Sequence, residues 1–163
     1  MQRKISKDLT LFYKDFFPTK LQLKKHYKYE ITLGLGGNIG NTQKIFHTLF
    51  LYLKKDTRFN IFQTSPILKN PPFGYLEQNY FCNSLLILQT NIHPLSVLNI
   101  MQKYEKKFKR IRTFQDAPRT LDIDIIFIKK FATFIKMNHP RLVVPHPGHN
   151  KRESVFIPLT LLQ

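Results

Sequence analysis

The chain has 163 residues, a formal net charge of +16 and a hydrophobic content of 42%. The length suits one domain with a real core, the apolar content argues against a disordered chain, and the single cysteine excludes an internal disulfide framework and suits a reducing cytoplasm. No apolar run approaches the length of a membrane span, and the excess of Lys and Arg predicts an anionic partner, such as nucleotide phosphates, nucleic acid or acidic lipid.

Residues 1–28 are predicted to form a basic extension in front of a single domain of residues 29–163. Lys and Arg far outnumber the acidic residues of this segment, Asp8 and Asp15. These charges interrupt its hydrophobic clusters, so a secretory signal is not expected. We expect its aromatic side chains to lie on the body of the domain, and the alternative is a flexible tail that engages acidic partners.

The domain is predicted to begin with a strand over residues 29–35, which a glycine-rich stretch ends. Asn38 is predicted to cap the helix that follows. The glycines do not form G-x-G-x-x-G, because Ile39 occupies the sixth position, and no P-loop sequence occurs. The glycine stretch is therefore interpreted as a tight turn between a strand and a helix.

The remaining elements complete a β-α-β-β-α-β order. Strands are predicted over residues 59–68 and 80–90, and Pro94 is predicted to begin the second helix. A basic, irregular segment over residues 106–119 precedes the fourth strand. This order is that of the ferredoxin-like α+β fold, an antiparallel sheet with helices packed on it, whose open face or loops host the function.

The fourth strand carries the most informative pair of side chains, Asp122 and Asp124. Side chains two apart on a strand share one face, so both carboxylates point the same way. Burying such a pair costs free energy unless cations neutralise it, and Mg2+ with its phosphate ligands is the usual partner. The alternative is an exposed edge strand with two solvated aspartates.

Arginines on both sides of the irregular segment favour phosphate binding beside the aspartates. Arg110, Arg112 and Arg119 present guanidinium groups that match phosphate oxygens bidentately, as transfer of a polyphosphate requires. A solvated basic loop is the alternative. Zinc at His139, His146 and His149 is not expected, because no Cys or H-E-x-x-H pattern accompanies these histidines.

The turn over residues 70–74 and the start of the third strand suit a flat heterocycle. Phe81 offers a ring face for stacking and Asn83 offers an amide that can pair with the edge of the heterocycle. The alternative is that these residues are only core and turn.

From about Tyr29 to Leu159 the chain resembles the hydroxymethyl-dihydropterin pyrophosphokinases of folate biosynthesis. The resemblance rests on the element Pro118-Arg119-Thr120-Leu121-Asp122-Ile123-Asp124 with the downstream Pro145-His146-Pro147. It also rests on Gly36-Gly37-Asn38, Pro71-Pro72-Phe73-Gly74, Phe81-Cys82-Asn83, Gln102 with Glu105, Arg110-Ile111-Arg112, Arg152, and Pro158-Leu159.

The resemblance implies transfer of the diphosphate of ATP to the hydroxymethyl group of the dihydropterin, with release of AMP. It implies two Mg2+ ions held by Asp122 and Asp124, and catalytic roles for these aspartates with Arg110 and Arg119. It assigns ATP to Gln102, Glu105, Arg110, Arg112, Arg119, His146 and Arg152, and the pterin to Asn70, Pro71, Phe73, Phe81 and Asn83. A cytoplasmic enzyme that is a monomer or weak dimer, with no nucleic-acid or membrane partner, is expected.

The chain departs from the family pattern at three places. Ser154 stands where relatives usually carry an aromatic that stacks on the other face of the pterin, and Phe156 follows two residues later. The segment between Arg110 and Arg119 is a residue shorter than in some relatives, and the chain has no Trp.

Two other function classes compete with an enzyme. A ferredoxin-like RNA-binding module suits the charge and the aromatics, but its K/R-G-F/Y stacking motif is absent, and paired carboxylates repel phosphate without metal. A purely structural partner protein would show neither turnover nor Mg2+-dependent nucleotide binding.

Overall fold

The structure is a computed structural model that describes residues 1–162. The elements in chain order are β1 (Gln2–Lys4), β2 (Thr10–Phe12), β3 (Thr19–Lys20), β4 (Tyr29–Gly37), α1 (Thr42–Lys55), β5 (Phe59–Thr64), β6 (Ile67–Asn70), β7 (Phe81–Thr90), α2 (Pro94–Lys107), β8 (Asp122–Lys130), β9 (Thr133–Phe134), β10 (Met137–His139), β11 (Leu142–Val144) and α3 (Glu153–Thr160). None of the helices within residues 1–162 is both long and apolar enough to cross a membrane.

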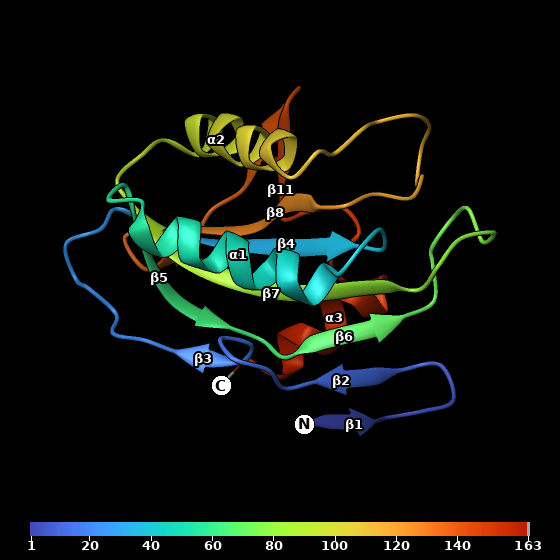
Figure 1. The fold of residues 1–163 in the computed structure, drawn as a ribbon. Helices are drawn as coiled ribbons and strands as arrows, with labels where there is room; N and C mark the ends of the chain where they lie inside the picture. The colour runs from blue at the N-terminus through green and yellow to red at the C-terminus, as the bar shows by residue number, and fades with distance from the viewer. Residues whose placement is uncertain (163) are drawn as a thin grey trace.

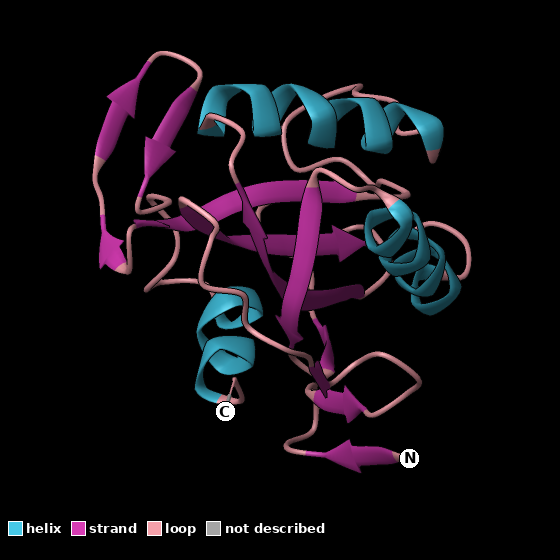
Figure 2. Ribbon diagram, turned by 90° about the vertical axis from the view of Figure 1, so that its left-hand side faces the viewer, coloured by secondary structure: helices cyan, strands magenta, loops and turns pink. Residues whose placement is uncertain are grey.

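One large antiparallel sheet organises the molecule. Its strand order is β1-β2-β6-β7-β4-β8-β9, and β5 pairs with β7 and carries β3 on its other side. Helices α1 and α2 lie on one face of this sheet and α3 lies on the other (Figure 1, Figure 2). The predicted mixed chain with an antiparallel sheet and helices packed on it is therefore confirmed.

Two predicted boundaries are wrong. The strand expected over residues 59–68 is divided into β5 and β6. The break falls at Ser65-Pro66, where Pro66 has no N–H to donate to a neighbouring strand. The expected first strand and turn also differ, because β4 continues to Gly37 and only Gly40 adopts a positive φ of 74° in the turn that follows.

The two main helices begin at recognisable signals. Pro94 is the first residue of α2, as predicted. The prediction that Asn38 caps α1 is wrong, because the helix begins three residues later and the side chain of Asn41 accepts a hydrogen bond from the backbone N–H of Lys44. Asn38 is instead buried, with contacts to two loops that are described below.

The two faces of the sheet have different roles. Ile123 and Ile125 of β8 join the main core beneath α1 and α2, together with side chains such as Phe46 and Met101. Asp122 and Asp124 alternate with these isoleucines, so they project from the opposite face. On that face α3 covers only one end, where Val155 packs on Leu85 and Ile126.

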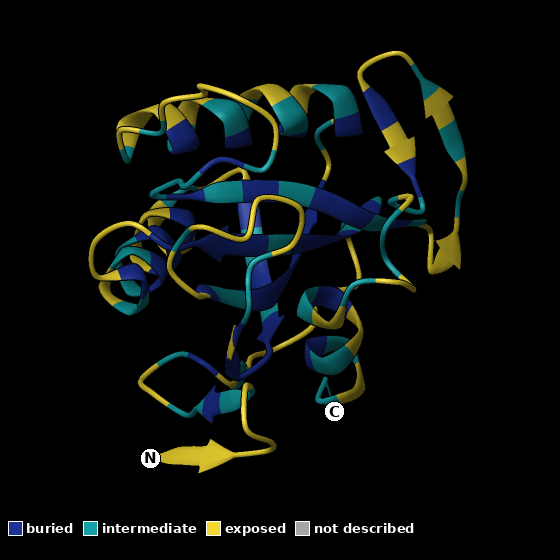
Figure 3. Ribbon diagram, turned by 90° about the vertical axis from the view of Figure 1, so that its right-hand side faces the viewer, coloured by how far each residue is buried: buried dark blue, intermediate teal, exposed yellow. Residues whose placement is uncertain are grey.

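The N-terminal segment is attached to this sheet. β2 pairs with β6 in register, with Leu11 opposite Leu68, and β3 pairs with β5. Leu11 and Phe17 are buried, and the ring of Phe16 stacks on that of Phe50 with centroids 4.3 Å apart. Figure 3 shows the outermost strand β1 exposed and the central strands buried.

Candidate active site

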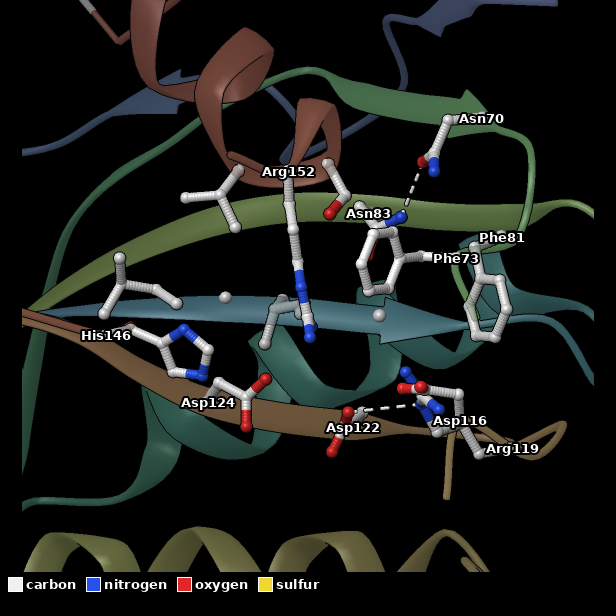
Figure 4. A pocket seen from close by; sticks show the side chains of 16 residues that line it. Asn70, Phe73, Phe81, Asn83, Asp116, Arg119, Asp122, Asp124, His146 and Arg152 are labelled. Carbon is white, nitrogen blue, oxygen red and sulfur yellow. Dashed lines mark hydrogen bonds and ion pairs between the residues drawn. The ribbon is translucent and has the colours of Figure 1, made fainter. Parts of the chain in front are cut away.

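A hollow lies on the sheet face that α3 partly covers, and Figure 4 shows the side chains around it. It is lined by Gly34, Leu35, Gly36, Asn70, Phe73, Phe81, Asn83, Asp116, Arg119, Asp122, Asp124, Ile126, His146, Arg152, Ser154 and Val155. Nine of the residues that the sequence predicted for the site are therefore brought together: Asn70, Phe73, Phe81, Asn83, Arg119, Asp122, Asp124, His146 and Arg152.

The floor of the hollow is open because β4 has glycines there. Gly36 is in register with Asn83 of β7 on one side and with Asp122 of β8 on the other. A Cβ atom at Gly36 would stand 2.8 Å from Oδ1 of Asn83, closer than such atoms approach. The missing side chain thus leaves space between the side chains of Asn83 and Asp122, whose strands are two strand spacings apart, about 10 Å.

Asp122 is bound by two arginines. Its Oδ1 lies 2.7 Å from Nη1 of Arg110 and its Oδ2 lies 3.1 Å from Nε of Arg119, and its side chain is 16% exposed. Asp122 is therefore not a fully solvated carboxylate, and its charge is balanced by the two cations predicted to bind phosphate.

Asp124 differs from Asp122 although it is only two residues away. No hydrogen bond or ion pair to its carboxylate occurs within residues 1–162. Burial, together with the negative charges of Asp122 and Glu105, raises the pKa of Asp124 to about 7, although the positive charges of Arg119 and Arg110 oppose this shift. A partly buried carboxylate without a cation is a good acceptor for one.

The chemistry of the two carboxylates fits Mg2+. They supply hard oxygen ligands in a partly buried setting, and Mg2+ uses one or two carboxylates completed by water and phosphate oxygens. No group of three or more His, Cys, Asp or Glu side chains suited to a metal occurs in the part of the chain that the structure describes. Asp122 and Asp124 offer a pair of carboxylates that could hold such an ion together with water and phosphate oxygens.

The predicted ATP residues of α2 lie beside this hollow rather than in it. Glu105 is only 4% exposed. Its Oε1 accepts hydrogen bonds of 2.8 Å from both Nη1 of Arg110 and the backbone N–H of Ile123. Burial raises the pKa of Glu105. Gln102, Glu105, Arg110 and Arg112 line a neighbouring hollow, and the side chain of Arg112 is 70% exposed.

Three hollows share their walls and so form one groove. The main hollow shares Asp116, Arg119, Asp122 and Arg152 with a second hollow along residues 110–119. The second shares Arg110 and Arg112 with the hollow at Gln102. The groove therefore runs from Asn70 and Phe81, past the two aspartates, to the exposed side of α2.

The end of the groove at Asn70 has the features of a slot for a flat ring. Nδ2 of Asn83 donates a 2.6 Å hydrogen bond to Oδ1 of Asn70. The guanidinium of Arg119 lies 4.8 Å from the centroid of Phe81, and that of Arg152 lies 4.7 Å from the centroid of Phe73, which is 63% exposed. Pro71 is not among the residues lining the hollow, and its carbonyl accepts a hydrogen bond from Nδ2 of Asn70.

His146 and Arg152 close the side of the hollow next to Asp124. Nδ1 of His146 accepts a hydrogen bond from the backbone N–H of Gly148 at 3.1 Å. Burial, with help from the charge of Arg152, lowers the pKa of His146. The imidazole is therefore neutral near pH 7 with its proton on Nε2, and Figure 4 shows the ring beside Asp124.

Some lining residues were not found from the sequence. The alternation of Gly34 and Gly36 on one strand is visible in the sequence, but only the pairing of β4 with β8 places them beside Asp124 and Asp122. Asp116 adopts a positive φ of 57° in an irregular segment, where no period assigns a direction to its side chain. Ser154 was noticed only as a departure from an expected aromatic, and it lines the hollow.

Comparison with known proteins gives consistent matches. The model of a family described as 7,8-dihydro-6-hydroxymethylpterin-pyrophosphokinase matches residues 32–163. A Campylobacter jejuni protein named 2-amino-4-hydroxy-6-hydroxymethyldihydropteridine pyrophosphokinase is 42% identical over 147 residues, which cover 90% of this chain and 91% of that protein. Proteins of the same name are 39% identical over 150 residues in Helicobacter pylori, covering 91% of this chain and 90% of that protein, and 28% identical over 127 residues in Bacillus subtilis, covering 78% and 74%.

Proposed function

Since the chain belongs to the 7,8-dihydro-6-hydroxymethylpterin-pyrophosphokinase family, we propose that its groove is the active site. There, diphosphate is transferred from ATP to the hydroxymethyl group of the dihydropterin in folate biosynthesis. The hydroxymethyl oxygen forms a bond to the β-phosphorus, and the bond from that phosphorus to the oxygen of the α-phosphate breaks. AMP leaves with that oxygen, and the hydroxyl proton is released. Such a transfer depends mainly on alignment and charge neutralisation.

The observation that carries the proposal is the pair of carboxylates at the middle of the groove. Asp122 and Asp124 project from one face of β8, and Asp124 has no hydrogen bond or ion pair within residues 1–162. In our proposal these two carboxylates would hold two Mg2+ ions. When bound, the metal supplies neutralisation of the phosphate charge and alignment of the attacking and leaving oxygens.

Arg110 and Arg119 are proposed to bind the transferred phosphates. Both guanidinium groups already lie at Asp122, at the centre of the groove. Their planar forks match phosphate oxygens. The neutral His146, with its proton on Nε2, can donate a hydrogen bond to a phosphate oxygen, and Arg152 beside it adds a positive charge. Gln102, Glu105 and Arg112 are proposed to line the nucleotide end, with Glu105 acting through Arg110, which it holds.

The pterin is proposed to occupy the other end of the groove. One face of its ring would stack on Phe81, and its edge would pair with Asn83 and with groups of residues 70–73, including Asn70 and Pro71. Phe73 is exposed at the mouth of this slot. Because Gly36 has no side chain, the hydroxymethyl group would be able to point from this slot toward Asp122.

We also propose how the domain around this site is organised. The strands β8, β4, β7 and the divided pair β5 and β6, with α1 and α2, would form the ferredoxin-like unit of a domain over residues 29–163. Residues 1–28 would be its basic extension, bound to the sheet through β2 and β3. A cytoplasmic monomer or weak dimer suits the single free Cys82.

The test is an assay of AMP formation from ATP and 6-hydroxymethyl-7,8-dihydropterin across a Mg2+ titration. Asp122→Ala and Asp124→Ala should each lower turnover at least about a hundredfold, or about 3 kcal/mol. Glu30→Gln is the control, because Glu30 lies on the same sheet in an ion pair with Lys129, and such a pair contributes little. Full activity of either aspartate variant, or wild-type turnover that is independent of Mg2+, would refute the metal assignment.

A further inference from the structure

Two loops that come from opposite sides of the groove contact each other. The pterin loop, residues 71–80, joins β6 to β7, and the arginine loop, residues 108–121, joins α2 to β8. Both lie at the same end of the molecule (Figure 1). The rings of Tyr75 and Phe114 meet edge to face with centroids 5.2 Å apart. Gly74 lies so near the carboxylate of Asp116 that a Cβ there would overlap it.

Gln78 of the pterin loop is hydrogen-bonded to both loops. Its Nε2 donates to the carbonyl of Asp116 at 2.8 Å and to the carbonyl of Tyr75 at 2.6 Å. Its Oε1 accepts a hydrogen bond of 2.9 Å from Nδ2 of Asn38. Both donors and the acceptor of this amide are therefore engaged, which gives the side chain one orientation.

Asn38 continues this connection to Arg119. Its Nδ2 also donates to the carbonyl of Asn79 at 3.0 Å. Its Oδ1 accepts a hydrogen bond from the backbone N–H of Arg119, and its own N–H donates to the carbonyl of Arg119, each at 2.9 Å. Asn38 thus fixes the backbone of Arg119 on both sides, and it is only 7% exposed.

Arg119 is the residue that both ends of the groove contact. Its guanidinium pairs with Asp122 at the phosphate position and lies over the ring of Phe81 at the pterin position. Gln78, Asn38 and Arg119 therefore form a continuous set of hydrogen bonds from the pterin loop to the centre of the groove.

We propose that Gln78 is a positioning residue that couples the two substrate subsites. This inference rests on the proposed function, since it needs the pterin at Phe81 and the triphosphate at Asp122. Ordering of the pterin loop by a bound pterin would hold the arginine loop, and with it Arg119, in place for the nucleotide. By linkage, bound nucleotide would strengthen pterin binding by the same factor.

The experiment is calorimetric titration with α,β-methylene-ATP and Mg2+, in the absence and presence of saturating 6-hydroxymethyl-7,8-dihydropterin. This analogue carries a methylene in place of the oxygen at the bond that breaks, so it binds without reacting. The ratio of the two nucleotide affinities measures the coupling. Gln78→Ala should lower this ratio by about fivefold, as expected for loss of hydrogen bonds between the loops.

Two further variants distinguish a positioning role of Gln78 from a general loss of loop structure. Gln78→Glu keeps the acceptor for Asn38 but loses both donors, so it should lower the ratio as Gln78→Ala does. Glu77→Gln is the matched control in the same exposed loop, and its ratio should equal that of the wild type. The reciprocal titration of pterin with and without nucleotide should show the same loss.

A wild-type ratio in both Gln78 variants would overturn the inference, and so would a wild-type protein that binds both ligands without coupling. A fall in both affinities with an unchanged ratio would also overturn it, because Gln78 would then only hold the fold of its own loop. A wild-type protein that binds neither ligand would refute the proposed function itself.

Discussion

Replacing Asp124 by Asn should make the protein more stable and almost inactive. In the metal-free protein the ionised carboxylate lies partly buried, and its pKa is raised from an ordinary value of 3.8 to about 7. Between these two values the folded state binds more protons than the unfolded state, so the contribution of Asp124 to stability falls as the pH rises through this window and stays low above it. The Asn side chain has nearly the same shape and no charge.

The size of the effect follows from the two pKa values. Their difference corresponds to at most about 4 kcal/mol, and residual contact with water reduces this to on the order of 1–2 kcal/mol. For a chain of this length that amounts to a rise in melting temperature of roughly 2–8 °C at pH 8. Near pH 4 the difference should vanish, because both side chains are then neutral in the folded protein.

The assay is thermal unfolding in EDTA at a series of pH values, followed by the same series with Mg2+. Asp122→Asn is the matched control, because it removes the ion pairs to Arg110 and Arg119 and should lower stability at pH 8 by roughly 1–2 kcal/mol. Mg2+ and nucleotide should stabilise the wild type more than either variant. An Asp124→Asn protein that is less stable than the wild type at both pH 8 and pH 4 would refute the reasoning.

Three further predictions concern separate parts of the molecule. Phe81→Ala and Asn83→Ala should weaken pterin binding at least about tenfold and leave nucleotide binding nearly unchanged; calorimetry with each ligand decides, and equal losses would indicate a folding defect. Arg119→Lys should slow single turnover at saturating substrates far more than it weakens equilibrium ATP binding, since lysine keeps the charge but lacks the planar fork; strongly reduced affinity with an unchanged single-turnover rate would contradict this. Phe17→Ala should lower the free energy of unfolding by about 3–5 kcal/mol, because this ring is buried in the main core; urea denaturation that shows less than 1 kcal/mol would place the N-terminal segment outside the cooperative fold.

Much of the site could be predicted because it lies on regular strands. The period of two along β8 fixes Asp122 and Asp124 on one face whatever surrounds them. Phe81 and Asn83, which were chosen for their stacking and pairing chemistry, also stand two residues apart on β7, and both line the hollow. Where the direction of a side chain follows from a local repeat, the sequence is sufficient to predict that direction.

The wrong predictions occur where contacts between residues far apart in the sequence determine which of two similar local patterns forms the structure. Asn38 and Asn41 both precede a run of helical residues, and either can cap a helix. Only the folded chain brings Arg119 and Gln78 to Asn38, which leaves Asn41 as the cap. No pattern within ten residues of Asn38 contains that information.

The short strands of residues 1–20 escaped prediction for a related reason. β1, β2 and β3 have two or three residues each, and β1 is wholly polar. Such segments have too few residues for a period, and their strand form comes from pairing with β6 and β5 rather than from their own propensity. The aromatic side chains of this segment were expected to lie on the body of the domain, but the burial of Leu11 and Phe17 depends on that pairing.

The pairing of β2 with β6 also determines which strand ends this side of the sheet. Without residues 1–20, the backbone of Ile67 and Leu68 would present free N–H and C=O groups beside two buried apolar side chains, a template for association with another unfolded or partly folded chain. With the segment in place, the outermost strand carries Gln2, Arg3 and Lys4, all exposed. Charged side chains on an edge oppose pairing with a second molecule, so the N-terminal residues protect the protein from aggregation through this edge.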